Sequence, residues 1–486
     1  MAQGKCCVYT TGALAVLLLI VSIILLVANV FQSAVERKVQ QDIVLKNATD
    51  TFEVWESPPA PIYVQFYFFN LTNPLEVLAG ERPIVEEIGP YTYREYRQRT
   101  DIQFLVNTTS VSALNPRTYV FEQEKSVGDP HVDLIRTVNV PAVAVMEMAK
   151  ANFWLRTFVE AILKTYQEGF FVTRSVQELL WGYKDELLTY VHTVKRDVDP
   201  VFGFYYKKNG TDDGEYVYLS GIDNYFDFAR IVKWQGNETL HWWTSDTCNM
   251  INGTDGTSFH PLISKEETLY MFVSDLCRSI YITYQSSQSV KGITAYRFVP
   301  PSKLFANVTI NPDNAGFCVP AGNCLGTGIL NVSTCMQGVP ILLSNPHFYQ
   351  AEDKYIHDIE GMHPNQEDHE SFIDINPLSG VIVRAAKRLQ VNVYVRQIPE
   401  FTIPEKIRTM VFPVMYVNET VLIDDESAEK LRSILLKTSV VSNIPFMIMV
   451  LGIVFGVIFI VLACRKQPAK EEEGTADERA SLIRTS

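Results

Sequence analysis

Residues 444–463 read IPFMIMVLGIVFGVIFIVLA, twenty residues without a charged side chain. A second apolar run lies near the N-terminus, where the only polar side chain between Gly12 and Ala28 is that of Ser22. At a rise of about 1.5 Å per residue, a helix of either length crosses most of a hydrocarbon layer of about 30 Å. We therefore expect a membrane helix at each end of the chain, within residues 8–31 and within residues 441–463.

The charges beside the second run orient the chain in the membrane. Arg465, Lys466 and Lys470 follow the run, and basic residues prefer the cytosolic side. The C-terminal tail (464–486) is then cytosolic, and with two spans the N-terminus (1–7) is cytosolic as well. For the first run the alternative is a cleaved signal peptide, but its apolar core is longer than the usual 7–15 residues.

The segment between the two runs, residues 32–440, carries many glycosylation acceptors. Nine Asn-x-Ser/Thr sequons occur in the chain, and all nine lie there. Ordinary composition predicts about three, so the excess indicates passage through the secretory pathway and a lumenal segment. The sequons begin at Asn47, Asn70, Asn107, Asn209, Asn237, Asn252, Asn307, Asn331 and Asn418.

The eight cysteines divide in the same way. Cys6, Cys7 and Cys464 lie beside the apolar runs, where thiols are palmitoylation candidates. The other five lie in the lumenal segment, an oxidising compartment in which disulfides persist. Four of these five fall between residues 277 and 335, which favours local pairing. Spacing alone does not choose the connectivity, and an odd number leaves one over. The five are Cys248, Cys277, Cys318, Cys324 and Cys335.

The lumenal segment is acidic. With Lys5 and the balanced charges of the tail set aside, it carries 36 Lys and Arg against 50 Asp and Glu, a formal charge of −14. All eight histidines lie there too, and most would protonate near pH 5. An acidic lumen therefore changes this surface, and its negative charge argues against nucleic acid as a partner.

Strand patterns dominate the lumenal segment, which has no internal repeat and no long linker. This favours one α+β domain over several. Branched and aromatic residues, or alternation of apolar and polar ones, predict strands. They cover Ile62–Phe69, Val290–Val299, 390–396 and Val411–Ile423.

Residues 142–194 change to a helical period. Helices are expected over Ala142–Gln167 and Ser175–Val194, and Ser175 with Glu178 has the spacing of a capping box. One apolar stripe runs along the first helix, and mutual packing is its ordinary explanation. Phe153 and Trp154 extend this apolar surface beyond one stripe, which favours a partner-binding face. The stripe contains Leu155, Phe158, Val159, Ile162, Leu163 and Tyr166.

No catalytic motif is present: there is no G-x-S-x-G, no H-E-x-x-H and no phosphate-binding glycine loop. The acidic, histidine-rich stretch from His357 to Glu370 has His363 and His369 six residues apart, which fits no metal-ligand spacing. We interpret it as a structural, pH-responsive loop. Carboxylate pairs formed only in space leave an enzyme as the alternative. We expect a protein that is not an enzyme and needs neither metal nor cofactor.

The tail contains a sorting pattern. Glu478 precedes Leu482 and Ile483 by four and five residues, as in acidic dileucine signals that clathrin adaptor complexes read. Two aliphatic side chains fit an adaptor pocket and the carboxylate fits a basic patch. The tail therefore predicts delivery to lysosomes and late endosomes.

Several stretches resemble the class B scavenger receptor family over nearly the whole chain. They are WESPPAPIYVQFYFFNLTNP (55–74), EEIGPYTYREY (86–96), LLWGYKDELL (179–188), NAGFCVPAGNCLGTGILNVSTC (314–335), EGMHPNQEDHESFIDINPLSG (360–380), TMVFPVMYVNE (409–419) and GTADERASLIRTS (474–486). The resemblance implies an antiparallel β-barrel with an internal hydrophobic tunnel and a helical bundle at its apex. It also implies the disulfides Cys277–Cys335 and Cys318–Cys324. The family's third bridge needs a cysteine near Gly316, so Cys248 is expected to stay unpaired.

The resemblance further implies a function. Such a protein is a lysosomal receptor that sorts the hydrolase β-glucocerebrosidase, binding it near neutral pH and releasing it in acid. The alternative is a receptor or conduit for cholesterol or phospholipid. The state of assembly, including a homodimer, stays open. The binding helix carries Phe153, Trp154, Leu155, Arg156, Phe158, Val159, Ile162, Leu163 and Tyr166.

One departure from the family concerns the acid switch. Close relatives place a histidine at the start of the binding helix, where this chain has Phe153 preceded by Asn152. Release in acid must then depend on other titratable groups. The candidates are His192, Glu147, Glu160 and Glu168.

Overall fold

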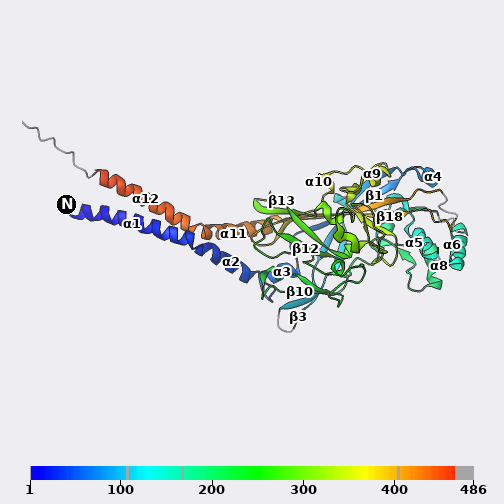
Figure 1. The fold of residues 1–486 in the computed structure, drawn as a ribbon, viewed down its shortest axis with the longest axis horizontal. Helices are drawn as coiled ribbons and strands as arrows, with labels where there is room; N and C mark the ends of the chain where they lie inside the picture. Colours follow the sequence, from blue (N-terminus) through cyan, green and yellow to red (C-terminus); the bar gives the residue numbers. More distant parts are fainter. Residues whose placement is uncertain (1, 106–108, 151, 166–168, 402–405, 466–486) are drawn as a thin grey trace, which may run out of the picture. The chain divides into compact units, whose positions relative to one another are not determined.

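The computed structural model describes residues 2–105, 109–150, 152–165, 169–401 and 406–465. The chain forms two units, drawn as a ribbon in Figure 1. The terminal unit joins residues 1–38 to residues 433–486, and the central unit comprises residues 39–432.

Two apolar helices from opposite ends of the chain pack together in the terminal unit. They are α1 (Ala2–Val27) and α12 (Ile444–Arg465). The two helices approach each other closely at glycines. A Cβ on Gly12 would come within 2.9 Å of the Phe459 ring, and a Cβ on Gly452 would come within 3.2 Å of Leu18 and Leu19. Small residues let apolar helices approach closely where no polar group drives association. The helices α2 (Val30–Asp42) and α11 (Asp425–Ser442) follow α1 and precede α12.

An antiparallel sheet of eleven strands forms the framework of the central unit. Its strand order is β12-β13-β14-β17-β18-β19-β1-β2-β5. The short strand β16 pairs on one side with the second half of β18 and on the other side with β15. The strands are β1 (Ile62–Leu71), β2 (Val85–Arg97), β5 (Arg117–Phe121), β12 (Thr268–Val273), β13 (Arg278–Val290), β14 (Ile293–Val299), β15 (Leu330–Asn331), β16 (Ile341–Ser344), β17 (Phe372–Ile375), β18 (Ile382–Val395) and β19 (Met410–Leu422).

The predicted strands are confirmed, with one turn inserted. β1, β18 and β19 cover three of the predicted ranges and are neighbours in the sheet. The fourth range is divided by Lys291 and Gly292, both with positive φ, which separate β13 from β14 as a tight hairpin. Gly292 suits this turn because glycine enters the left-handed region without steric cost.

The large sheet is open along its backbone. Its end strands β5 and β12 do not pair with each other in the described part of the chain, so the predicted barrel is not closed by a hydrogen-bonded ladder. The backbone of Arg117, at the start of β5, instead pairs with Thr211. Its guanidinium lies 3.6 Å from the carboxylate of Asp275, which directly follows β12 in the short helix η4 (Ser274–Leu276). Side chains, rather than strands, connect the two edges.

Smaller elements complete the central unit. A four-stranded sheet has the order β11-β10-β4-β3, and two further pairs are β6–β7 and β8–β9. These strands are β3 (Thr100–Phe104), β4 (Ser110–Leu114), β6 (Leu134–Val138), β7 (Phe171–Ser175), β8 (Tyr183–Lys184), β9 (Val201–Phe202), β10 (Tyr216–Leu219) and β11 (Ile231–Trp234). Short helices are α3 (Asp50–Glu56), α4 (Pro74–Leu78), α9 (Asp353–His357), α10 (Gln366–His369), η1 (Gln123–Lys125), η2 (Tyr225–Asp227), η3 (Thr247–Asn249), η5 (Ser302–Phe305), η6 (Pro312–Phe317) and η7 (Pro346–Phe348).

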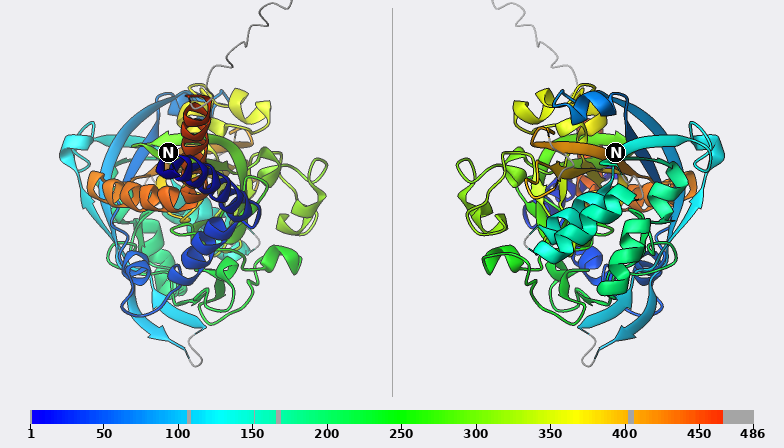
Figure 2. Two further views of the ribbon diagram at one scale, coloured as in Figure 1. Left: turned by 90° about the vertical axis from the view of Figure 1, so that its left-hand side faces the viewer. Right: turned by 90° about the vertical axis from the view of Figure 1, so that its right-hand side faces the viewer.

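The helical region comes as four helices instead of the two expected. They are α5 (Val140–Ala149), α6 (Phe153–Thr165), α7 (Val176–Trp181) and α8 (Glu186–Val194). The second predicted helix is interrupted at Gly182, whose φ of +117° no helix tolerates. The capping box is confirmed, because Ser175 accepts the N–H of Glu178 and the Glu178 carboxylate accepts the N–H of Ser175. In Figures 1 and 2, α5, α6 and α8 gather at the end of the central unit opposite α3.

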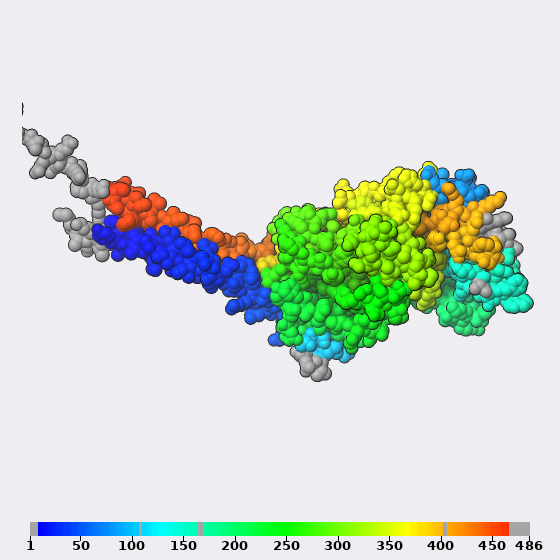
Figure 3. Space-filling view, in the orientation of Figure 1, coloured from blue at the N-terminus to red at the C-terminus, as the bar shows by residue number. Residues whose placement is uncertain are grey.

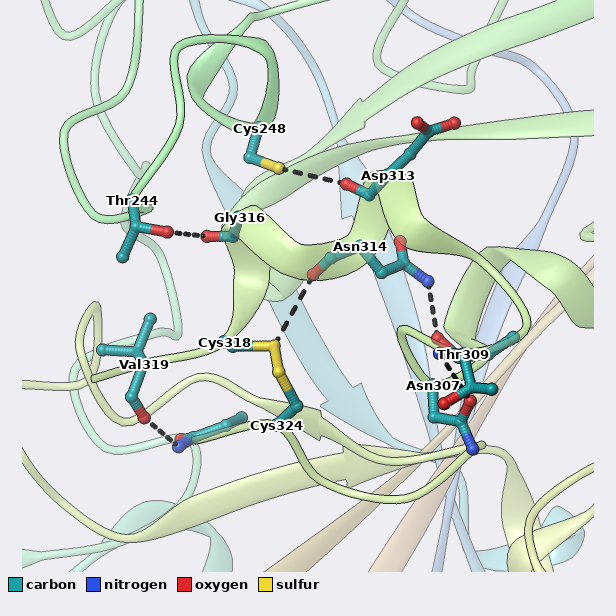
Figure 4. The surroundings of a disulfide bond; sticks show 12 residues. Thr244, Cys248, Asn307, Thr309, Asp313, Asn314, Gly316, Cys318, Val319 and Cys324 are labelled. Carbon is teal, nitrogen blue, oxygen red and sulfur yellow. Dashed lines mark hydrogen bonds between the residues drawn. A yellow bond between two sulfur atoms is a disulfide. The ribbon is translucent and has the colours of Figure 1, made fainter. Parts of the chain in front are cut away.

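Two disulfides join loops of the central unit. Cys277 is bonded to Cys335 and Cys318 to Cys324, the pairs that the resemblance implies. Cys248 is buried with a free thiol (Figure 4).

Candidate functional site

The helix α6 begins at a side-chain cap. The Asn152 side chain accepts the N–H groups of Trp154 and Leu155, each at 3.1 Å, and so satisfies two donors that a helix start leaves unpaired. Asparagine is among the best residues for this position. The cap fixes where α6 starts and presents Phe153 and Trp154 in its first turn.

The buried side of α6 belongs to the core. Val159 is fully buried, Ile162 and Leu163 are nearly so, and Leu155 is half-buried against the same cluster. This cluster also contains residues of α5 and α8 and of strands β18 and β19. These four members of the predicted stripe therefore pack inside the protein.

The outer side of α6 is apolar and uncovered. Trp154 is 81% exposed, Phe153 60% and Phe158 38%. The Phe153 and Trp154 rings meet edge to face at 5.6 Å, and the Arg156 guanidinium lies 5.2 Å from the Phe153 ring. We call Phe153, Trp154 and Phe158 the aromatic face. Aromatic and arginine side chains grouped in this way are typical of interface anchors. The space-filling view shows this helical end of the central unit (Figure 3).

One acidic candidate for an acid switch, Glu147, is held in its charged form. Although burial raises the pKa of Glu147, hydrogen bonds from Arg396 and Lys150 hold it below its usual value, so this carboxylate stays charged near pH 5. Glu160 is half-buried on α6, and Glu168 lies outside the described residues. His192 on α8 bonds the Val198 carbonyl through Nδ1 at 2.7 Å, which a ring with a proton on Nδ1 can do in either charge state.

The structure brings together a cluster that the spacing of residues did not predict. His347 and His369 stack at 4.5 Å between ring centres, and both are buried. His347 Nε2 lies 2.6 Å from the Glu87 carboxylate, whose other oxygen accepts the Tyr416 hydroxyl at 3.1 Å. These residues come from chain segments far apart in sequence, so only the histidine-rich stretch containing His369 gave a signal. Among the described residues, no group of three His, Cys, Asp or Glu is placed to hold a metal ion.

The remaining predicted positions are the sequon asparagines, Tyr166 and the sorting residues of the tail. Asn107, Tyr166 and the sorting residues Glu478, Leu482 and Ile483 lie outside the described residues. Of the other sequon asparagines, Asn47, Asn209 and Asn237 are exposed, and Asn70, Asn252, Asn307, Asn331 and Asn418 are half-buried. Each of these eight asparagines therefore reaches the surface.

An apolar helix at each end, each long enough to cross a membrane, and a β-rich unit between them define a protein anchored twice in a membrane. The sequence matches the model of the CD36 family over residues 13–463. The chain belongs to the CD36 family, which confirms the resemblance found in its motifs.

Full-length relatives refine this assignment. The chain is 57% identical over 483 residues to Lysosome membrane protein 2 of Mus musculus and 56% identical to that of Homo sapiens, covering 99% of this chain and 100% of either relative. It is 32% identical over 459 residues to Scavenger receptor class B member 1 of Sus scrofa, covering 92% of this chain and 89% of that protein. The chain is therefore a two-span protein of the lysosomal membrane.

Proposed function

We propose that this chain is a receptor, not an enzyme, that binds β-glucocerebrosidase and sorts it to lysosomes. The observation that carries the proposal is the aromatic face of α6, an uncovered apolar surface on an otherwise acidic lumenal segment. Trp154 and Phe153 expose most of their surface to solvent. A docked protein would bury them, and aromatic anchors supply much of the binding energy of such interfaces.

Capture and release at two pH values test this proposal. The purified full-length protein in detergent is expected to retain β-glucocerebrosidase at pH 7 and to lose it at pH 5. Because α6 contains no histidine, the loss in acid must then depend on other titratable groups. Folded protein that captures no hydrolase at either pH would contradict the proposal, and capture that is equal at both would contradict release in acid.

The C-terminal tail supplies the lysosomal sorting signal in this proposal. Adaptor complexes would read Glu478, Leu482 and Ile483, with both termini cytosolic and residues 32–440 lumenal and glycosylated at the sequons. Changing Leu482→Ala together with Ile483→Ala is expected to move most of the protein from lysosomes to the cell surface, since the adaptor pocket loses both aliphatic side chains. Surface biotinylation measures the shift. Leu436→Ala, which changes an exposed leucine of α11, is the matched control. An unchanged lysosomal fraction in the double variant would contradict the proposed sorting signal.

Transfer of cholesterol or phospholipid through a tunnel is the second function we propose. The ionic contact between Arg117 and Asp275 supports it, because side chains bring the two edges of the large sheet together and could complete a barrel around an interior. Lys387 of β18 also forms an ion pair with the Asp275 carboxylate at 3.0 Å, which connects the β12 edge to a strand in the middle of the sheet. Lipid that co-purifies with the protein would support this function, and its absence in native mass spectra would count against it.

A further inference from the structure

Two backbone N–H groups of one surface segment are bonded to imidazole rings. The N–H of His363 donates to Nδ1 of His347, and the N–H of Asn365 donates to Nδ1 of His369, each at 3.0 Å. A backbone amide can only donate, so each Nδ1 must be an acceptor without a proton. A proton at Nδ1 of either ring would therefore break one of these two bonds. Arg388 also holds the segment, because its guanidinium donates to the carbonyls of Glu367 and Glu370 at 2.8 and 2.7 Å.

The remaining contacts of the two rings fit this state. With Nδ1 as an acceptor, His347 carries its proton on Nε2 and donates it to Glu87 of β2. Its backbone N–H donates to the buried side chain of Gln390 at 2.7 Å. The charged or titratable groups that face the stacked rings are Glu87 of β2, Tyr67 of β1, Tyr416 of β19, Arg388 of β18 and Asp368 of the segment itself.

Acid works against this arrangement. Both rings are buried, whereas His363 and residues 365–368 are exposed to solvent. Burial, and then the neighbouring His347, lower the pKa of His369 to about 4, below the ordinary value of 6.5. The closed segment is thus fully stable above pH 6.5 and loses stability as the pH falls from 6.5 towards 4.

We propose that residues 363–369 form an acid-sensitive latch, closed while His347 and His369 accept the two backbone bonds and opened when either ring binds a proton at Nδ1. A proton there removes the acceptor and places a cation in the stack. Opening uncovers the buried Tyr416, which stacks on Tyr67 at 4.5 Å. The latch is a property of the fold and does not depend on the proposed hydrolase partner.

Hydrogen exchange of the full-length protein in detergent tests the latch. Exchange rates are corrected for the pH dependence of the chemistry, and protection of the amides in 363–369 is compared with that of β18. We expect protection of the segment to fall about tenfold or more between pH 7.5 and pH 4.5, while β18 keeps its protection. Equal protection of the segment at the two pH values would overturn the proposal.

Glutamine variants assign the effect to the rings. His347→Gln with His369→Gln provides amide oxygens that can accept a hydrogen bond but do not titrate, so exchange in 363–369 should become independent of pH, whether the segment is then protected or exposed. His357→Gln is the matched control, because His357 is an exposed ring of the same region that faces a carbonyl, that of Asp353, and holds no backbone N–H. Acid opening that persists in the double variant would overturn the proposal.

Discussion

Trp154→Ala is expected to weaken binding of β-glucocerebrosidase at pH 7 by about 30-fold, because truncation of a central aromatic anchor removes about 2 kcal/mol of binding free energy. The unfolding temperature should not change, since the indole is 81% exposed and supports little of the core. Phe158→Asp should add to the loss by placing a charge at the edge of the aromatic face. Titration of the labelled hydrolase against the receptor measures both effects.

Two matched variants separate binding from packing. Phe226→Ala removes another exposed aromatic ring, on η2 and outside the helical region, and should leave capture unchanged. Ile162→Asp buries a charge in the core under α6, and should unfold the region and lower the unfolding temperature. If Trp154→Ala and Phe158→Asp both bind as tightly as the unchanged protein, the partner docks elsewhere.

Gly316→Cys is expected to stabilise the central unit by forming a third disulfide with Cys248. A Cβ on Gly316 would lie 2.6 Å from the Cys248 sulfur, near the separation of about 3.0 Å that bonded cysteines adopt. Thr244 positions Gly316 by donating both its N–H and its hydroxyl to the Gly316 carbonyl, each at 3.0 Å (Figure 4). Closing a loop of about 70 residues contributes roughly 4 kcal/mol in the chain-entropy model.

One obstacle decides how this variant is built. The same Cβ would lie 2.2 Å from the Ser245 hydroxyl, so the change should be combined with Ser245→Gly. Urea unfolding without reductant measures the gain in free energy, and peptide mapping identifies the bridge. Cys248→Ala in the same background cannot form the bond and is the control. Two free thiols at positions 248 and 316 after oxidative folding would refute the prediction.

The sequence predicted much of the fold because much of it is local. The two anchors follow from the length of uncharged runs, and Ser175 with Glu178 forms its capping box within one turn. The strands β1, β18 and β19 follow from short-range patterns. Helix breaks were harder to predict, because Gly182 and the Asn152 cap act against an apolar period that continues through them.

The candidate site was predicted only in part. The sequence selected α6 and its aromatic excess, but a stripe of apolar residues does not tell which side is covered. In the structure, the stripe residues Val159 and Ile162 are buried in the core, whereas Phe153 and Trp154 remain exposed to solvent. The difference depends on the neighbouring helices α5 and α8, which are placed by tertiary contacts.

By itself, then, the sequence determined the anchors, the strand pattern and the family. Only the tertiary structure placed Cys248 beside Gly316 and joined His347 to Glu87, His363 and His369. The physical reason is that helical periods and apolar lengths act within a few residues of the chain. Contacts between distant segments depend on strand register and loop paths, which form only when the whole central unit packs. The two apolar runs that anchor the chain could be identified from the sequence, whereas the acid-sensitive latch could be identified only from the tertiary structure.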